Sequence, residues 1–94
     1  MLSKIPINLE KVDKKNIDTE ILRAGIIAEL DAINLYEQMA AIAQDKNIKA
    51  VLLDIAKEEK THVGEFQTLL LNRDQEQAKE LKEGRKEIKE EVSE

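Results

Sequence analysis

Two long segments of this chain repeat core-type positions at alternating intervals of four and three residues. In the first segment these positions are Leu22, Ile26, Glu29, Ile33, Tyr36, Ala40 and Ala43. In the second they are Ile48, Leu52, Ile55, Glu59, His62, Phe66 and Leu69. Such spacing aligns the residues of each segment along one side of an α-helix that packs lengthwise against other helices. We call these two lines of residues the seams, and they predict an all-α fold.

The polar stretch QDKN separates the two periodic segments. Helices of roughly 25 residues, each about 37 Å long, joined by so short a loop are expected to form an antiparallel hairpin. Asp18 and Thr19 are candidate caps for the first helix, and Asn72 and Asp74 are expected to end the second and start a third. A hairpin holds only half of the core of a four-helix bundle, so we expect two chains to dimerise into such a bundle.

The chain is expected to divide into an N-terminal arm, residues 1–17, the helical hairpin, residues 18–72, and a charged C-terminal helix or tail, residues 73–94. Pro6 argues against an early helix in the arm. The last segment has Gly84 within a narrow apolar stripe, and a glycine there costs a helix roughly 1 kcal/mol relative to alanine. This segment is either a solvated helix or an arm that docks between subunits.

Composition narrows the choice of ligands and partners. The formal net charge is -5, which makes nucleic acid an unfavourable partner. The absence of cysteine excludes disulfides, thiolate metal sites and a cysteine nucleophile, so a metal would have to be held by carboxylates and imidazole. Neither a signal peptide nor a run of apolar residues long enough for a membrane span is evident, and we expect a cytoplasmic protein.

Three seam positions are polar: Glu29, Glu59 and His62. An ionised carboxylate in a core costs several kcal/mol unless it is paired or bound to a cation. Counted at 1.5 Å per residue from the bend, the three side chains lie at about the same depth in the hairpin, between about 20 and 25 Å. They are therefore expected to meet.

Glu59 and His62 also have the Glu-x-x-His spacing, which directs both side chains to one point. In di-iron carboxylate bundles, two helices each contribute a Glu and two others each contribute Glu-x-x-His. A twofold dimer of this hairpin would supply that whole set, with Glu29, Glu59 and His62 of each chain around two metal ions. The alternative is structural: Glu59 would pair with a lysine and His62 would be a hydrogen-bonded core histidine.

Four further residues are candidates for supporting roles. Tyr36 could donate a hydrogen bond that orients a ligand carboxylate, or it could be an ordinary core aromatic. Asp31, Glu58 and Glu65 lie beside the proposed ligands but off the seams. They could form an acidic route that concentrates cations near the site, or they could simply be solvated.

The stretches AELDAINLYEQMA, residues 28–40, and LLDIAKEEKTHVGEF, residues 52–66, resemble the encapsulated ferritins. These are ferritin-like proteins that work inside encapsulin nanocompartments, as free cargo or fused to the shell protein. The likeness covers roughly residues 18–72 and is strongest to the archaeal, shell-fused type.

This resemblance implies a ferritin-like four-helix bundle formed by two subunits, within a decamer that is a pentamer of dimers. It implies ferroxidase activity at a di-iron site between subunits, with Glu29, Glu59 and His62 as iron ligands and Tyr36 as the neighbouring tyrosine. It implies two iron ions per dimer and an encapsulin shell as partner, with the protein in the shell lumen, where iron would be stored as mineral. Asp31 and Glu58 would match acidic positions on the route to the site.

The sequence departs from the family pattern in two places. Some members carry a further glutamate directly before the ligand glutamate, where this chain has Ala28. The C-terminal KEEVSE has no apolar targeting peptide, so we expect either a domain of a longer fusion or docking elsewhere.

Several alternatives stay open at this stage. Mn(II), Zn(II) or calcium could take the place of iron at such ligands. A rubrerythrin-like di-iron peroxide reductase and a non-catalytic helical assembly module are the alternative functions.

Overall fold

Helices dominate residues 9–92, the part of the chain that the computed structural model describes. The elements are a short 3-10 helix η1 (Leu9–Lys11) and the α-helices α1 (Ile17–Ile42), α2 (Lys46–Arg73) and α3 (Gln75–Glu91). No strand occurs within these residues. The predicted all-α fold is therefore confirmed. The first eight residues of the predicted arm and the last two residues of the predicted tail lie outside the described part.

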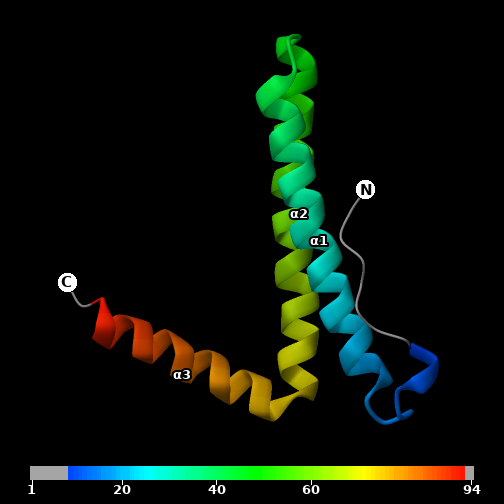
Figure 1. The fold of residues 1–94 in the computed structure, drawn as a ribbon, viewed down its shortest axis with the longest axis vertical. Coiled ribbons are helices and arrows are strands. Elements are labelled where there is room, and N and C mark those ends of the chain that lie inside the picture. The colour runs from blue at the N-terminus through cyan, green and yellow to red at the C-terminus, as the bar shows by residue number, and fades with distance from the viewer. Residues whose placement is uncertain (1–8, 93–94) are drawn as a thin grey trace.

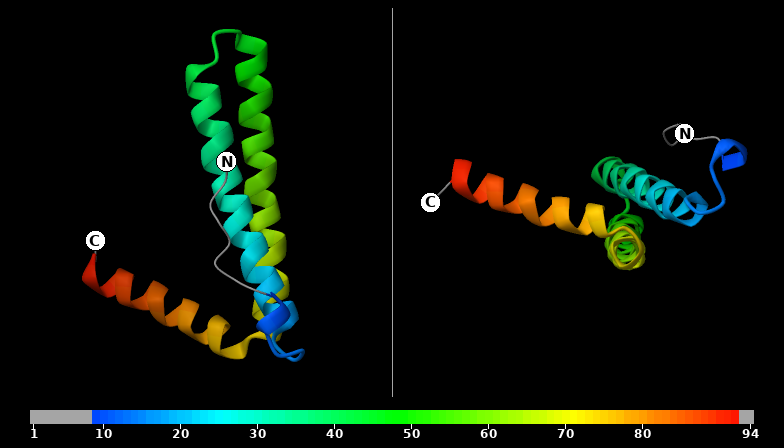
Figure 2. Two further views of the ribbon diagram at one scale, coloured as in Figure 1. Left: turned by 45° about the vertical axis from the view of Figure 1, so that its right-hand side comes forward. Right: turned by 90° about the horizontal axis from the view of Figure 1, so that it is seen from below.

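The helices α1 and α2 run antiparallel and side by side along their whole length (Figures 1 and 2). The tight bend between them depends on Asp45, the N-cap of α2, whose Oδ1 accepts hydrogen bonds from the backbone N–H groups of Asn47 at 2.7 Å and Ile48 at 3.0 Å. These bonds satisfy amides that have no partner inside the helix. The predicted hairpin is therefore confirmed, and α2 begins about one half-turn before the start that its seam suggests.

The start of α1 differs from the prediction. Asn16 is the N-cap residue, and its side chain makes no capping hydrogen bond. Asp18 and Thr19, the predicted caps, lie inside the first turn. An acid in the first turn still interacts favourably with the positive end of the helix dipole. Asp18 in addition faces Arg73 at the end of α2, with Oδ2 and Nη2 3.7 Å apart.

Asn72, expected to end the second helix, lies inside α2. Asp74 is the single residue between α2 and α3 and, as predicted, caps the start of α3. It is the C-cap of α2 and the N-cap of α3, and its Oδ1 accepts a hydrogen bond from the backbone N–H of Gln77 at 2.9 Å. Its Oδ2 lies 2.6 Å from Nη2 of Arg23 on α1. The helix α3 then projects away from the hairpin (Figure 1), and none of its Cα atoms lies within 8 Å of one in α1.

The core of the single hairpin is small. The buried apolar residues are Leu22, Ile33, Ala40, Ala56 and Leu70. The three on α1 belong to its predicted seam. On α2, however, the buried residues each follow a seam residue by one position, and the seam residues Ile48 and Leu69 are 57% and 54% exposed. Thus α2 is rotated so that part of its seam faces away from α1.

None of the helices in residues 9–92 combines the length and the hydropathy that crossing a bilayer requires.

Candidate metal centre

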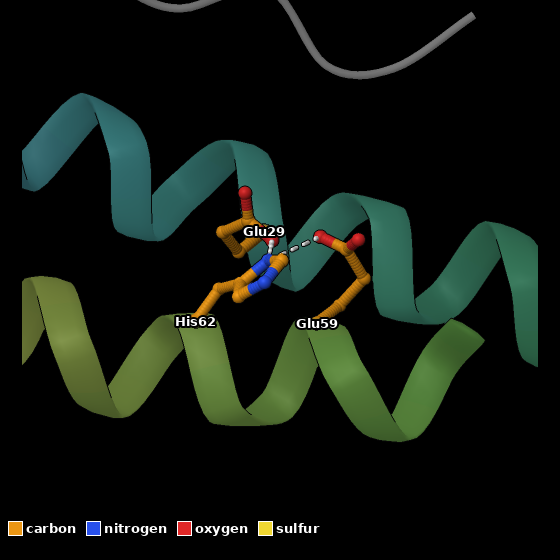
Figure 3. Close-up of side chains that lie close together, drawn as sticks. All are labelled: Glu29, Glu59 and His62. Atoms are coloured by element: carbon orange, nitrogen blue, oxygen red, sulfur yellow. Dashed lines mark hydrogen bonds and ion pairs between the residues drawn. The ribbon is translucent and has the colours of Figure 1, made fainter. Parts of the chain in front are cut away.

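Glu29 on α1 faces Glu59 and His62 on α2 across the middle of the hairpin (Figure 3). One ligand-type atom of each side chain, a carboxylate oxygen or an imidazole nitrogen, lies within 4.8 Å of those of the other two. Within residues 9–92 this is the single group of three or more such side chains placed to share a metal ion. The three side chains therefore meet, as their spacing predicts.

Imidazole Nδ1 of His62 lies between the two carboxylates. It is 3.3 Å from Oε2 of Glu29 and 3.6 Å from Oε2 of Glu59. The two glutamate side chains are largely shielded, at 19% and 18% exposed, whereas His62 is 44% exposed. The site is therefore enclosed on the carboxylate side and open on the side of the imidazole.

The chemistry of these donors fits a divalent cation. Two carboxylates held this close repel each other when both are ionised, and a cation between them removes that repulsion. Carboxylate and imidazole ligands of an ion such as Zn²⁺ bind at about 2.0–2.2 Å, so two donors of one ion lie at most about 4.4 Å apart. The three donor atoms here lie within 4.8 Å of one another, so any excess over that limit is at most a few tenths of an ångström. A small inward movement of the side chains would close the gap.

One chain supplies three donors, which leaves coordination positions on an ion unfilled, since protein-bound divalent transition metals take four or more ligands. The open side at His62 is where further donors would have to approach. Those donors can come from water or from another chain.

The other predicted site residues lie outside this group. Tyr36 is half-buried on α1, and within the described chain no hydrogen bond links it to Glu29, Glu59 or His62. Asp31 is half-buried, whereas Glu58 and Glu65 are exposed on α2. None of the three belongs to the group of metal-type donors. Their role as a route for cations stays a prediction.

Two cross-helix contacts near the site were not anticipated. Nζ of Lys60 lies 2.9 Å from Oε2 of Glu37, an exposed ion pair between α2 and α1. Gly25, in the interior of α1, lies against the ring of Phe66 on α2. The sequence does carry a signal for the second contact, which is a glycine inside a long helix. A glycine there destabilises the helix, so it is often present because another side chain packs against it.

Comparison with known proteins shows the family to which this chain belongs. Residues 5–85 match the protein family described as EncFtn-like. The chain belongs to the EncFtn-like family. The fold of this EncFtn-like chain also matches a crystal structure of the encapsulated ferritin domain from Pyrococcus furiosus, with a TM-score of 0.81 and 57% sequence identity. That match covers 96% of this chain and 92% of the other.

Two curated relatives support the assignment. The EncFtn-like chain is 60% identical over 92 residues to a ferritin-like-encapsulin shell fusion protein from Pyrococcus furiosus. It is 40% identical over 75 residues to the encapsulin nanocompartment cargo protein EncC from Myxococcus xanthus. These matches cover 96% and 77% of this chain. The chain spans only 27% of the length of the first relative and 58% of the second.

Proposed function

We propose that this protein is a ferroxidase, which oxidises Fe(II) to Fe(III) at a site that two chains share. The observation that carries the proposal is the meeting of Glu29, Glu59 and His62 from two helices of an EncFtn-like hairpin. In this proposal the iron ions are the substrate, and two of them bind per dimer. The two ferrous ions each give one electron to dioxygen, and two protons from water complete its reduction to hydrogen peroxide.

The protein groups have distinct roles in that reaction. Glu29 and Glu59 of both chains supply four negative charges, which offset most of the charge of two divalent ions. The same charges favour the ferric product, because the extra positive charge of Fe(III) develops next to them. Neutral His62 supplies a nitrogen donor on the open side of the site. Tyr36 is proposed to orient a ligand carboxylate by hydrogen bonding.

A line of residues on α2 supports the involvement of a second chain. Ile48, Ile55, His62 and Leu69 recur every seven residues and so lie along one side of the helix. Ile48 and Leu69 are more than half exposed, and the His62 side chain is 44% exposed. We call these four residues the outer stripe. In the proposed dimer the outer stripe packs against the partner, which brings two sets of donors together and covers apolar surface that one hairpin leaves in water.

The relatives suggest where this reaction takes place. The names of the two curated relatives refer to an encapsulin shell and to encapsulin cargo. By analogy, we propose that this protein works in the lumen of an encapsulin nanocompartment and that a larger ring, such as a decamer, is built from the dimers. The oxidised iron would then be stored inside the shell rather than by this protein.

An anaerobic Fe(II) titration followed by native mass spectrometry tests the proposal, because it reports subunit number and bound iron together. We expect assemblies with an even number of chains that saturate at one tightly bound iron per chain. Admission of air should then produce ferric absorption in proportion to the bound iron.

Two results would contradict the proposal. Assemblies that bind no iron would mean that the three donors are structural. Oxidation that is faster with hydrogen peroxide than with dioxygen would indicate a peroxide reductase instead.

A further inference from the structure

The ring of Phe66 on α2 packs closely against Gly25 on α1. A Cβ atom built on Gly25 would lie 3.3 Å from each of three ring carbons of Phe66, Cδ2, Cε2 and Cζ. Carbon atoms in favourable contact are about 3.5–4.0 Å apart. A side chain at position 25 would therefore require the ring of Phe66 to move by a few tenths of an ångström.

This contact lies directly beside the candidate metal centre. Gly25 is one helical turn before Glu29 on α1, and Phe66 is one turn after His62 on α2. Because the helices run antiparallel, both residues are at the same end of the site. Residues one turn apart on a helix lie on the same face, so the contact and the donors share one interhelical surface.

The separation of α1 and α2 at this level decides whether the donors can meet. Glu29 comes from one helix, whereas Glu59 and His62 come from the other. Their ligand-type atoms lie within 4.8 Å of one another, whereas donors that share one ion lie at most about 4.4 Å apart, so there is little room for a wider separation. A further separation of a few tenths of an ångström would thus act directly on the geometry of binding.

We propose that Gly25 and Phe66 act as a spacer that fixes the distance between α1 and α2 beside the metal centre. Gly25 is then a positioning residue, which brings Glu29 within reach of the ion that Glu59 and His62 bind. The inference rests on the proposed function, since it assumes that a metal binds there. It assigns the glycine a role in metal affinity rather than in stability alone.

The chain contains a matched control for this inference. Gly64 lies in the interior of α2, two residues after His62, and a Cβ built on it meets no atom within 4 Å. Gly25→Ala and Gly64→Ala make the same chemical change near the same site, and both exchange a glycine for a better helix former. Only the first introduces a contact with Phe66.

Co(II) titration followed by visible absorption tests the inference, because it measures affinity and ligand geometry without turnover. We expect Gly25→Ala to bind Co(II) about tenfold more weakly than the wild-type protein, the low end of the loss seen when an orienting group is removed from a metal site. Its absorption spectrum should change as well. Gly64→Ala should match the wild type in both respects.

A compensating variant distinguishes a spacer from a general packing defect. Phe66→Leu alone should weaken binding, because the ring no longer sets the separation. In the double variant Gly25→Ala/Phe66→Leu the new methyl group takes up the space that the ring leaves. We expect it to bind Co(II) more tightly than either single variant, which is a favourable coupling in a double-mutant cycle.

Several outcomes would overturn the inference. Equal binding by Gly25→Ala and the wild type would overturn it alone, as would equal weakening by Gly25→Ala and Gly64→Ala. A wild-type protein that binds no Co(II) would overturn it together with the proposed function. Circular dichroism shows whether Gly25→Ala folds. If it does not fold, weak Co(II) binding by a well-folded double variant would overturn the inference alone.

Discussion

Nδ1 of His62 on α2 lies 3.3 Å from Oε2 of Glu29 on α1, although the two residues are 33 positions apart in the chain. The pair is formed by the hairpin and cannot exist in either helix alone. If a cation binds here, as we propose, this contact couples its binding to folding of the hairpin.

Replacement of Glu29 by glutamine tests the donor set with little change in size. Glu29→Gln removes one negative charge from the group of three donors, so we expect Fe(II) affinity to fall by more than the 10–100-fold that loss of a supporting residue costs a metal site. Anaerobic calorimetry measures the affinity. Glu37→Gln is the matched control, because Glu37 is on the same helix and pairs with Lys60 outside the donor group. Equal binding by Glu29→Gln and Glu37→Gln would exclude Glu29 as a ligand.

Metal addition should raise the thermal stability of the protein. A ligand present at 100 times its Kd stabilises the folded state by about 2.7 kcal/mol if the unfolded chain does not bind it. For a small domain this corresponds to a rise in Tm of about 10 °C or more. Thermal unfolding with Mn(II), followed by circular dichroism, measures the shift. A chelator should reverse the shift, and Glu29→Gln should show a much smaller one. An equal shift in that variant would mean that the ion binds elsewhere.

A charge within the outer stripe should weaken assembly. In the proposed dimer Leu69, which is 54% exposed in the single chain, is covered by the partner. Leu69→Glu would bury an unpaired carboxylate there, so we expect dissociation into smaller species, measured by sedimentation velocity. Gln67→Glu adds the same charge two positions away and serves as control. Unchanged sedimentation of Leu69→Glu would place the interface elsewhere.

Two substitutions at Asp74 separate its functions at the junction of α2 and α3. Asp74→Asn retains a side-chain acceptor for the N–H of Gln77 but loses the ion pair with Arg23, so we expect a loss of stability below about 1 kcal/mol. Asp74→Ala loses both contacts, and a missing N-cap alone costs about 1 kcal/mol. Hydrogen exchange in the first turn of α3 should rise much more in Asp74→Ala. Equal exchange in the two variants would contradict a capping role.

The depth of the three donors along the hairpin could be predicted, because it depends only on the number of residues between each donor and the bend. A fixed rise per residue and a known bend place Glu29, Glu59 and His62 at one depth, whatever the packing details. The rotation of a helix about its own axis is less constrained. The seam suggests that Leu69 is a core residue, but Leu70 is buried instead, because a wide apolar face allows a helix to turn by one residue without a large loss of buried area.

Helix caps and the spacer contact depend on finer geometry. Asp18 and Thr19 are good capping residues by type, yet the backbone starts its helical turn at Ile17. The contact of Gly25 with Phe66 requires both the rotation and the separation of two helices, and neither is encoded in a spacing pattern. The glycine inside a long helix indicates a close contact at position 25, but the sequence does not indicate which residue makes it.

The junction at Asp74 has a consequence for how the length of α2 can vary. With a single residue between two helices, no linker absorbs a change in length. Each residue inserted between His62 and Asp74 would rotate the start of α3 by about 100° around the axis of α2 and move it by about 1.5 Å. The direction of α3 relative to the three donors therefore depends on the number of residues between His62 and Asp74. An insertion or deletion there preserves this direction only if its length is close to a whole number of helical turns.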